Sequence, residues 1–454
     1  MSTVNSISNK RILRYISKDF DISVSRIKQL VSDFHSEMAK GLSGKKSSLK
    51  MIPTYVDKSC RKELGRFIAL DLGGTNLRIL ELELRGKGKI SISAEKKVAL
   101  KKRYIKGAQA GFFDFIAGSV KKFVEEKKID TSGKVDLGFT FSFPIKQTGI
   151  ASGILLRWTK DFSVKGIEGK EVVGLLRDAL ARKGLKNIRI AALVNDTVGT
   201  LVARSYADPS CDIGVILGTG TNACYREKIS RITKLVQSKT KTGFMIINIE
   251  WGNFNKLKSN SYDIRLDNAS VNPREQILEK MVSGMYLGEI VRLVISDLAG
   301  KNALFRGALL PVLNERGCFK TEYMSIAEVD SSERLSRVAG LLKCLGINKS
   351  SLDDRRLIKE ICKIVSSRGS RISAAALSAV VTRIDSSLLR KHTVAVDGSL
   401  YEKHPGYAQN IKSALKQIFA SKSRNIRLVL TKDGSGKGAA ITAAVAASQK
   451  EGYA

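Results

Sequence analysis

Three glycine-rich turns, each placed just after a short apolar run, constrain the fold of this chain more than any other feature. The runs 67–72, 213–217 and 426–430 lead to GGTN (73–76), GTGTN (218–222) and DGSGKG (433–438). Short apolar runs bounded by glycine are typical of buried strands. After the first two turns the chain re-enters an apolar segment, whereas the third leads into a predicted helix over 439–448. The two similar strand-turn-strand units predict two similar lobes.

Glycine turns of this kind expose backbone N–H groups that can bind phosphate oxygens, because no Cβ lies in the way. If the two lobes face each other, the three turns converge on one nucleotide. For DLGGTN (71–76) the alternative is a tight hairpin turn without a ligand, since Gly and Asn commonly serve turns. GSGKG is not a P-loop, because that motif needs Ser or Thr after its lysine and Gly438 follows Lys437.

The pattern around the first turn predicts a local architecture. Leu80, Leu82 and Leu84 alternate with charged residues, which indicates a hairpin with one buried face. A strand over 90–98 and a helix over about 111–127 follow. At the N-terminus, Ile12, Tyr15 and Ile16 have the spacing of one helix face.

The composition is that of a globular chain. Its 454 residues, 43% of them hydrophobic, are enough for two domains. No apolar stretch approaches the roughly 18 residues of a membrane helix, and the N-terminus lacks the pattern of a secretory signal. Six cysteines lie far apart in the sequence, and none forms a CxxC pair. This spacing indicates reduced thiols. We therefore expect a cytoplasmic protein.

The charge is strongly basic, with 78 Lys and Arg against 43 Asp and Glu, a net charge of +35. The excess is distributed along the chain, and no nucleic-acid-binding motif accompanies it. The densest run, KKVALKKRYIK (96–106), interleaves bases with apolar residues as the solvated face of a strand does. The basicity indicates weak non-specific binding or a cellular adaptation, and we expect no specific nucleic-acid partner.

The segment LVNDTVGTL (193–201) places two polar residues, Asn195 and Asp196, between an apolar run and a helical pattern. A helix N-cap explains such residues without any function. An ionisable carboxylate at a helix N-terminus is also held as an anion by the helix dipole, which suits a proton acceptor. Both interpretations stay open at this point.

Nine segments occur in the order found in one protein family. They are FIALDLGGTNLRIL (67–80), LGFTFSFPIKQTGIASGILLRWTKDF (137–162), VGLLRDAL (173–180), LVNDTVGTL (193–201), GVILGTGTNACY (214–225), INIEWGNF (247–254), NPREQILEKMVSGMYLGEIVRL (272–293), VAVDGSLYEKHPGY (394–407) and GSGKGAA (434–440). With them the chain resembles the eukaryotic-type hexokinase family, including glucokinases, of the actin-like ATPase superfamily.

The resemblance implies an α/β protein with the two-lobed ribonuclease H-like or actin-like ATPase fold and a cleft between a small and a large lobe. We expect an N-terminal helical segment at 1–65 that packs on the large lobe. The small lobe would comprise 66–195 and about 439–454, and the large lobe 196–438. One copy of the catalytic unit fits in the chain, which would act as a monomer or homodimer.

The resemblance also implies the reaction: transfer of the γ-phosphoryl group of ATP to the 6-hydroxyl of a hexose, glucose foremost, the first step of glycolysis. Asp196 resembles the family's catalytic base, and Lys160 would face the transferred phosphoryl group. Mg²⁺ would arrive with ATP and contact the protein through water on Asp71, without direct protein ligands.

Two sets of binding residues are implied by matching positions in the segments. The hexose set is Ser142, Phe143, Thr159, Lys160, Asn195, Asp196, Asn222, Glu250 and Glu279. The nucleotide set is Asp71, Leu72, Gly73, Gly74, Thr75, Asn76, Arg78, Thr219, Gly220, Thr321, Ser325, Gly398, Ser399 and Lys403. Read singly, these residues also fit caps, turns and solvated positions.

The chain departs from the family pattern at a few positions. Asp161 follows Lys160 where glycine is usual, and it adds a negative charge beside the lysine. Ala151 and Ile249 replace polar residues, and Met285 stands where glucokinases often carry a lysine. None of these positions is among the expected sugar-binding residues or the base.

Two rival functions remain at this stage. A hexokinase-like sugar sensor or scaffold would bind sugar without turnover, although such a protein needs neither Asp196 nor Lys160. An actin-type or chaperone-type ATPase has no use for the sugar segment 137–160, Glu250 or Glu279. The preference among glucose, mannose and fructose cannot be predicted from these residues.

Overall fold

Two mixed β-sheets organise the computed structural model, which describes residues 2–158, 162–235, 242–308 and 310–451. One sheet has the strand order β4-β3-β2-β5-β8 and the other β1-β11-β10-β9-β12-β13. The strands of the first sheet are β2 (Leu64–Leu72), β3 (Asn76–Arg85), β4 (Ile90–Ala99), β5 (Val135–Phe141) and β8 (Ile188–Val194). Those of the second are β1 (Ile52–Pro53), β9 (Cys211–Leu217), β10 (Thr221–Lys228), β11 (Phe244–Asn248), β12 (His392–Asp397) and β13 (Ile426–Leu430). A hairpin of β6 (Ile145–Gly149) and β7 (Ser152–Leu155) lies apart from both.

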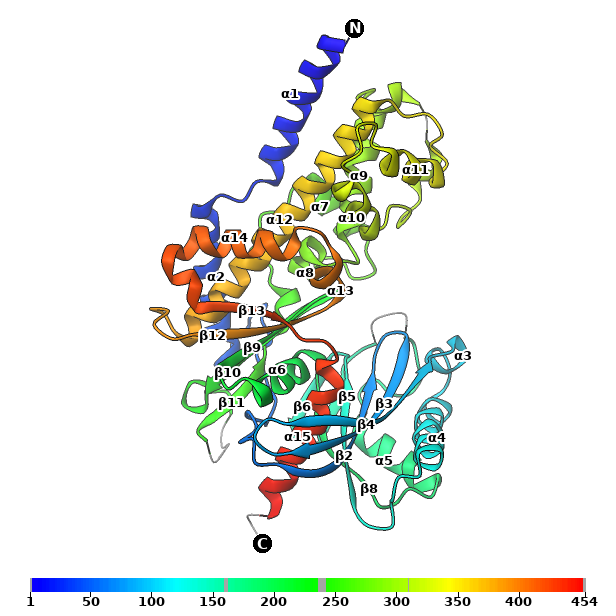
Figure 1. The fold of residues 1–454 in the computed structure, drawn as a ribbon, viewed down its shortest axis with the longest axis vertical. Helices are drawn as coiled ribbons and strands as arrows, with labels where there is room; N and C mark the ends of the chain where they lie inside the picture. Colours follow the sequence, from blue (N-terminus) through cyan, green and yellow to red (C-terminus); the bar gives the residue numbers. More distant parts are fainter. Residues whose placement is uncertain (1, 159–161, 236–241, 309, 452–454) are drawn as a thin grey trace.

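Helices fill the chain between the strands. They are α1 (Ser2–Phe20), α2 (Val24–Leu42), α3 (Lys102–Ile105), α4 (Gln109–Lys127), α5 (Val172–Arg182), α6 (Asp196–Ala207), α7 (Ser261–Asn268), α8 (Ile277–Val282), α9 (Leu287–Gly300), α10 (Thr321–Val329), α11 (Ser336–Cys344), α12 (Leu352–Ile384), α13 (Ser399–Lys403), α14 (Tyr407–Phe419) and α15 (Gly434–Glu451). Short 3₁₀ turns lie at Ile229–Arg231, Trp251–Asn253, Phe305–Gly307, Pro311–Asn314 and Ala420–Asn425. Figure 1 shows the five-stranded sheet at one end of an elongated molecule and the long helix α12 leading to the other end.

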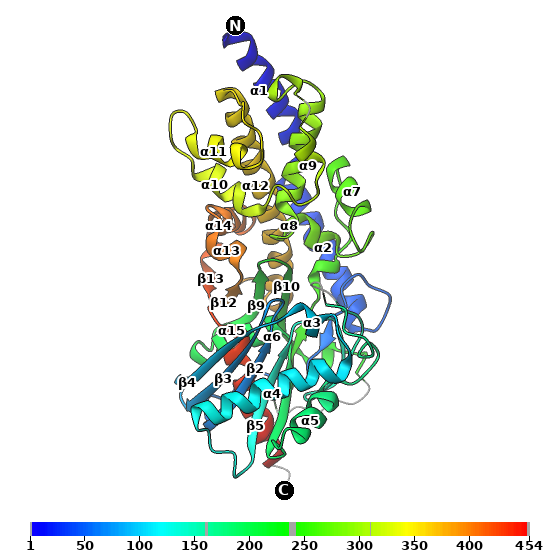
Figure 2. The same ribbon diagram turned by 90° about the vertical axis from the view of Figure 1, so that its right-hand side faces the viewer.

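The five-stranded sheet is covered on both faces. Leu77 and Ile79 of β3 belong to the core beneath α4 and α5, whereas Leu80, Leu82 and Leu84 pack with residues of α15 and α6. Figure 2 shows α4 in front of the strands and α15 behind them. The prediction of a hairpin with one buried face is therefore wrong, because helices distant in sequence cover both sides.

Helix α6 joins the two sheets. It starts directly after β8, the last strand of the five-stranded sheet, and packs on β9 and β10 of the other sheet and on α15. Leu201 and Val202 of α6 are fully buried in the same core as β3 and α15. The N-terminus of α6 consequently lies where the two sheets approach each other.

The N-terminal helices α1 and α2 pack against α12, beyond the six-stranded sheet. Ile16 and Phe20 of α1 are buried in the large core that α12 shares. Tyr15, expected on the same face, is 70% exposed, because it lies one position off the stripe formed by Ile12, Ile16 and Phe20. The division of the chain at residues 65, 195 and 438 stays a prediction.

Two expected boundaries differ in the structure. Helix α15 begins at Gly434, five residues earlier than predicted, so Gly434 to Gly438 are helical and only Asp433, with a φ of 60°, turns the chain. The run 96–106 is not one solvated strand, because β4 ends at Ala99 and α3 begins at Lys102. None of the described helices is both long and apolar enough to cross a bilayer.

Candidate active site

Asn195 and Asp196 lie at the N-terminus of α6, and both interpretations of this segment find support in the geometry. The Asn195 side chain accepts a hydrogen bond from the Thr197 N–H at 3.0 Å, so it is the N-cap. The Asp196 carboxylate accepts from the same N–H at 2.8 Å and from the Thr197 hydroxyl at 3.2 Å. Negatively charged side chains interact favourably with the helix dipole at a helix N-terminus. Asp196 is half-buried, so its carboxylate is held in place without being sealed in the core.

A carboxamide network lies beside this helix start. The Asn222 side-chain amide donates to Asn248 Oδ1 at 2.8 Å and to Glu250 Oε1 at 3.2 Å, with Asn195 Oδ1 at 3.5 Å. Asn248 Nδ2 also donates to Glu250 Oε1, at 2.9 Å. The network fixes the orientation of each amide, since donors and acceptors alternate along it. It brings three predicted sugar-binding residues, Asn195, Asn222 and Glu250, to one place.

Glu250 itself has unusual backbone geometry. Its φ of 57° and ψ of 49° lie in the left-handed region, which is uncommon for a residue with a side chain. The buried Trp251 that follows donates its indole N–H to Thr221 Oγ1 at 2.8 Å and anchors the turn. Strained backbone held by packing of this kind is characteristic of functional sites.

Glu279 of α8 reaches the same region. Its carboxylate accepts the backbone N–H of Thr221 at 2.9 Å. A Cβ built on Gly220 would lie 2.8 Å from Glu279 Oε2, and one on Gly252 would lie 3.2 Å from Glu279 Cβ. Glycine at these two positions therefore makes room for the carboxylate next to the β9–β10 turn.

The predicted residues of the 137–162 segment lie partly in the core. Ser142 and Phe143 directly follow β5, and both are buried. The Phe143 ring packs against Trp158 at 4.8 Å and Phe162 at 4.7 Å between ring centroids, which is the geometry of a core aromatic cluster. Thr159 and Lys160, and with them Asp161, lie outside the described residues.

The β2–β3 turn carries the first group of predicted nucleotide residues. Asp71 is the penultimate residue of β2, next to the turn. Ser435 Oγ of α15 donates a hydrogen bond to Asp71 Oδ2 at 2.6 Å. Leu72 is fully buried, whereas Thr75 is exposed and accepts the Asn76 side-chain amide at 2.8 Å. The Gly73 N–H bonds to the Asn76 carbonyl at 3.0 Å and closes the turn, with Gly74 inside it.

Arg78, in the strand after this turn, is held by two carboxylates. Its guanidinium donates to Glu95 at 2.7 Å and to Asp433 at 2.7 Å. The Arg78 guanidinium lowers the pKa of Asp433, although partial burial of the carboxyl acts to raise it. The pair ties the β3 strand to the residue immediately before α15.

Two further glycine turns contact each other. A Cβ on Gly218 would lie 3.3 Å from the Cα of Gly398, so the β9–β10 turn and the end of β12 touch through their backbones. Thr219 in this turn is exposed and accepts the Met285 N–H at 3.1 Å through its carbonyl. Gly398, with a φ of 119°, adopts a conformation that other residues rarely take.

The remaining predicted nucleotide residues lie on two short helices. Thr321 and Ser325 are on α10, and Thr321 Oγ1 accepts the Gly288 N–H at 2.9 Å, which satisfies a free donor of α9. Ser399 and Lys403 begin and end α13, and both are exposed. The structure brings Gly398 and Ser399 next to Gly218; for Ser325 and Lys403 it records no contact with the Asp196 region.

Three residues near the site were not singled out in the sequence. Asn248 lies at the centre of the amide network, and Ser435 binds Asp71. Asp397, at the end of β12, is a half-buried carboxylate near Asp196 and Asp433. Burial and the nearby negative charges raise the pKa of Asp397. The hydrogen bond that its carboxylate accepts from the Gly398 N–H at 2.6 Å acts in the opposite direction. The strict alternation in INIE (247–250), which puts Asn248 and Glu250 on one face, was a usable signal for Asn248.

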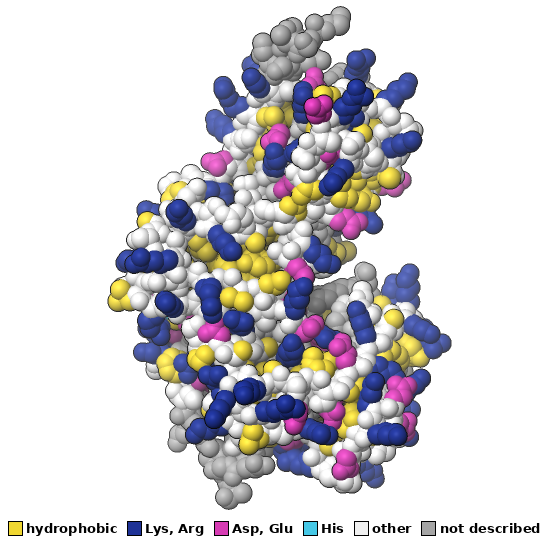
Figure 3. Space-filling model, viewed as in Figure 1, with side chains coloured by type: hydrophobic (Ala, Val, Ile, Leu, Met, Phe, Trp, Pro, Cys, Tyr) yellow, Lys and Arg dark blue, Asp and Glu magenta, His cyan; other side chains and the backbone are white. Residues whose placement is uncertain are grey.

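The carboxylates of the site are separate rather than clustered. No group of three His, Cys, Asp or Glu side chains in the described part of the chain is arranged to hold a metal ion. Asp71, at the mouth of a glycine turn, is a carboxylate of the type that binds Mg²⁺ through water. Figure 3 shows a notch at the edge of the molecule between the two sheet-bearing parts, with basic side chains on both rims.

Comparisons with known proteins agree with this arrangement. Family models described as hexokinase match residues 12–206 and 212–445. The chain is 39% identical over 448 residues to Hexokinase-7 of Oryza sativa subsp. japonica, with 96% of each protein covered. It is 40% identical to Hexokinase-1 of Spinacia oleracea, over 95% of this chain and 90% of that protein. A solved hexokinase from Schistosoma mansoni complexed with glucose superposes with a TM-score of 0.87 at 36% identity, covering 96% of this chain and 99% of that one.

Proposed function

The chain belongs to the hexokinase family, with the two-lobed α/β fold of the actin-like ATPases, and on that premise we propose how its residues phosphorylate a hexose with ATP. The substrate we propose is glucose, bound beside the N-terminus of α6. The observation that carries the proposal is the convergence of Asn195, Asp196, Asn222 and Glu250, with Glu279 next to them. These side chains offer the carboxylates and amides that a polyhydroxylated ring requires.

The proposed reaction is an in-line displacement. As the bond from the sugar O6 to the γ-phosphorus forms, the bond from that phosphorus to the bridging oxygen of ADP breaks. The proton of the 6-hydroxyl passes to the Asp196 carboxylate, which the Thr197 N–H and hydroxyl hold in position. Lys160 would offset the negative charge on the transferred group. ADP and the hexose 6-phosphate then leave.

Selectivity for sugar follows from the amide network. Asn222, Asn248 and Glu250 already orient one another, so a bound hydroxyl meets donors and acceptors in fixed directions. A sugar analogue that lacks one hydroxyl leaves a buried polar group unpaired, which costs about 1–3 kcal/mol. We therefore propose that Asn195, Asn222, Glu250 and Glu279 contact sugar hydroxyls.

The nucleotide would bind across the glycine turns, with its phosphates near 73–76 and 218–220. Asp71 would hold Mg²⁺ through water, and the ion supplies charge neutralisation at the β- and γ-phosphates. The N-terminus of α15, whose Ser435 binds Asp71, directs its dipole toward the same region. Arg78, held by Glu95 and Asp433, would orient the β2–β3 turn.

A coupled assay of glucose-dependent ADP release tests this function. We expect turnover by the wild type, and for Asp196→Ala a loss of about 10²- to 10⁴-fold in kcat. Asp178→Ala, at an exposed position of α5, is the matched control and should leave kcat unchanged. Glucose binding without turnover in the wild type would indicate a sugar sensor; equal turnover in Asp196→Ala would remove that residue as the base.

For the cellular setting we propose the cytoplasm, because all six cysteines are free and reduced thiols suit that compartment. We propose a monomer or a homodimer. Imaging of a fluorescent fusion tests the compartment, and analytical ultracentrifugation tests the assembly. Accumulation in an organelle or a larger oligomer would contradict these two proposals.

A further inference from the structure

A buried acid and a buried imidazole face each other away from the reacting groups. Glu328 Oε1 of α10 lies 3.6 Å from His404 Nε2, and the two side chains are 10% and 2% exposed. Neither ring nitrogen of His404 has a hydrogen-bond partner, nor has Oε1 of Glu328. Buried polar atoms are normally satisfied. The contact therefore pairs two polar atoms, Nε2 and Oε1, that have no other hydrogen-bond partner, and at 3.6 Å it is longer than a direct hydrogen bond.

The contact joins two elements that carry predicted nucleotide residues. Glu328 belongs to the last turn of α10, which begins at Thr321 and includes Ser325. His404 is the residue that ends α13, which runs from Ser399 to Lys403. Among the residues that the structure describes, no other hydrogen bond or ion pair links α10 to α13. The Glu328–His404 contact is thus the polar connection between these helices.

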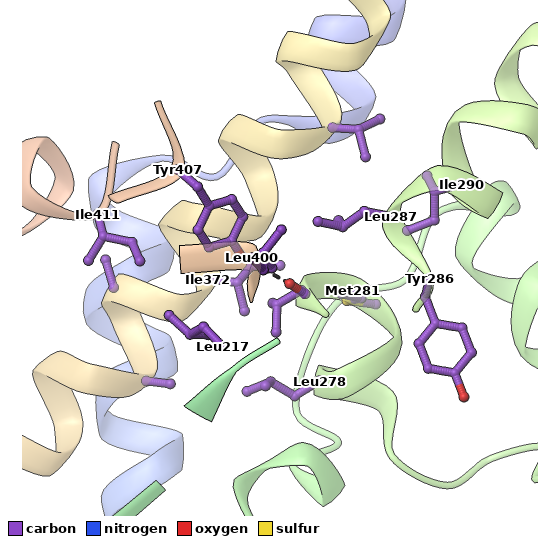
Figure 4. Close-up of a cluster of buried hydrophobic side chains, with 14 of the residues drawn as sticks. Leu217, Leu278, Met281, Tyr286, Leu287, Ile290, Ile372, Leu400, Tyr407 and Ile411 are labelled. Atoms are coloured by element: carbon purple, nitrogen blue, oxygen red, sulfur yellow. Dashed lines mark hydrogen bonds between the residues drawn. The ribbon is translucent and has the colours of Figure 1, made fainter. Parts of the chain in front are cut away.

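Packing around His404 connects this contact to α8, the helix that carries Glu279. The His404 ring lies edge-on to Tyr407, with 5.8 Å between centroids. Tyr407 Oη donates to the Val282 carbonyl at 2.9 Å, and Val282 ends α8, the helix of Glu279. Figure 4 shows Tyr407 among Leu217, Met281, Leu287 and Leu400, in the core that connects these helices. This packed core gives the Glu328–His404 contact a rigid support.

Burial sets the protonation of the pair. Burial raises the pKa of Glu328 to about 7, and the nearby Glu360 acts in the same direction. The Ser366 hydroxyl and the Lys363 and Lys359 ammoniums oppose this rise, because they stabilise the carboxylate. Burial lowers the pKa of His404 to about 4. The buried Cys362 thiol also faces Glu328 and stays protonated, since burial raises its pKa. Burial therefore disfavours the charged form of both side chains in the folded protein.

We propose that Glu328 and His404 are positioning residues for the nucleotide: their buried contact fixes α10 to α13, and removing the contact weakens nucleotide binding. The inference rests on the proposed function, because it takes these helices as part of the nucleotide site. A deprotonated Glu328 places a charge in a buried position, and the cost of this burial outweighs the attraction of the Lys363 and Lys359 ammoniums. Its rehydration would separate α10 from α13, while the sugar residues around Asn222 keep their own network.

The test measures MgADP binding by calorimetry, together with KM for ATP and for glucose, at about pH 6.5 and about pH 8.5. Glu328→Gln keeps a neutral hydrogen-bonding side chain of the same shape; Glu328→Ala and His404→Gln remove the contact. The exposed Glu333→Gln is the control. Because the ionisation of ADP affects every variant alike, the difference between wild type and Glu328→Gln isolates the pair.

We expect Glu328→Ala and His404→Gln to bind MgADP about fivefold more weakly, within the usual range of coupling between sites, with an unchanged KM for glucose. Glu328→Gln should match the wild type at the lower pH and lose less affinity at the higher pH. Wild-type affinity in all three variants, or an equal loss in Glu328→Gln and Glu328→Ala, overturns the proposal. Absent turnover in the wild type would count against the proposed function, whereas the MgADP measurement still decides the role of the pair.

Discussion

Gly199 of α6 and Gly438 of α15 meet backbone to backbone, so closely that neither position has room for a side chain. A Cβ on Gly438 would overlap the Cα and carbonyl oxygen of Gly199, and one on Gly199 would lie 2.8 Å from the Ser435 carbonyl oxygen. Both helices begin at the candidate site, α6 with Asp196 and α15 beside Asp71. The crossing of two helices at glycine thus fixes the distance between the base and the phosphate-side carboxylate.

The first prediction concerns this crossing. Gly438→Ala should lower the free energy of unfolding by roughly 1–3 kcal/mol, the usual cost of overpacking a close contact. Because α15 cannot shift without moving Ser435 away from Asp71, kcat should fall as well. Chemical denaturation and the coupled assay measure the two effects.

Gly118→Ala is the matched control for this substitution. Gly118 lies in the interior of α4, and a Cβ built there meets no atom within 4 Å. Alanine has the higher helix propensity, so the variant should gain about 0.5–1 kcal/mol. Similar changes in the free energy of unfolding for Gly438→Ala and Gly118→Ala would show that Gly438 is packed no more closely than Gly118.

The second prediction addresses the amide network. Asn248→Ala removes the group that accepts from Asn222 and donates to Glu250. We expect KM for glucose to rise by the equivalent of about 1–3 kcal/mol, since two polar groups lose their shared partner. KM for ATP should change little. Glucose titrations at saturating ATP measure the effect.

Asn314→Ala, at an exposed position, serves as the control for Asn248→Ala. Asn248→Asp is the sharper variant, because its carboxylate would lie against Glu250 and repel it. It should raise KM for glucose more than Asn248→Ala does. If KM for glucose stays at the wild-type value in both Asn248 variants, the network does not orient the sugar residues.

The strands of the fold could be predicted because apolar runs bounded by glycine signal buried strands wherever they occur. Strand β13 was predicted with its observed bounds, and the first two glycine turns lie between strands as expected. The third turn was predicted wrongly, since glycine has low helix propensity and 434–438 nevertheless begins α15. Each of these glycines lies against a distant part of the chain: a Cβ on Gly438 would overlap Gly199, one on Gly434 would lie 2.8 Å from Thr200 Cα, and one on Gly436 would lie 2.6 Å from Leu80 Cδ1. No local pattern contains that information.

The candidate site also contains some residues that local sequence indicates and others that it does not. A helix cap was one of the two interpretations of Asn195 and Asp196 from local sequence, and the Asn195 side chain does cap α6. Alternation in INIE could have added Asn248, the last residue of β11, which pairs with Cys224, two positions from Asn222 in β10. Glu279 and Asp397 reach the site only through tertiary packing; Glu279 was implied by the family resemblance, and Asp397 was not singled out. The positions proposed from the family resemblance remain predictions that mutation must test.

The third prediction concerns the net charge of +35. Lys and Arg side chains are scattered over the visible face in Figure 3. We expect retention on heparin that falls steeply with salt, because counterion release drives such binding. Alanine at Lys101, Lys102 and Lys106, all exposed, should reduce the salt dependence slightly. Loss of all retention in this triple variant would instead locate a single specific site there.

The last prediction follows from a buried histidine at the other end of β12. His392 Nδ1 lies 2.8 Å from Asp212 Oδ2, its Nε2 lies 3.3 Å from Asp385 Oδ2, and its side chain is fully buried. Burial opposes the charged imidazolium, but Asp212 and Asp385 outweigh it and raise the pKa of His392 above 6.5. The ring joins β12 to β9 through Asp212 and to the end of α12 through Asp385.

Because the folded state raises this pKa, His392 contributes stability that is fully present below its unfolded pKa, near 6.5. That contribution is lost as pH rises through the higher folded value, by about 1.4 kcal/mol for each unit of difference. Thermal unfolding between about pH 6 and pH 9 should therefore show a falling Tm in the wild type. His392→Gln should have a lower Tm at about pH 6 and a flatter curve above it. Parallel curves for the two proteins would contradict the raised pKa, because they would mean that the folded and unfolded states bind the His392 proton equally.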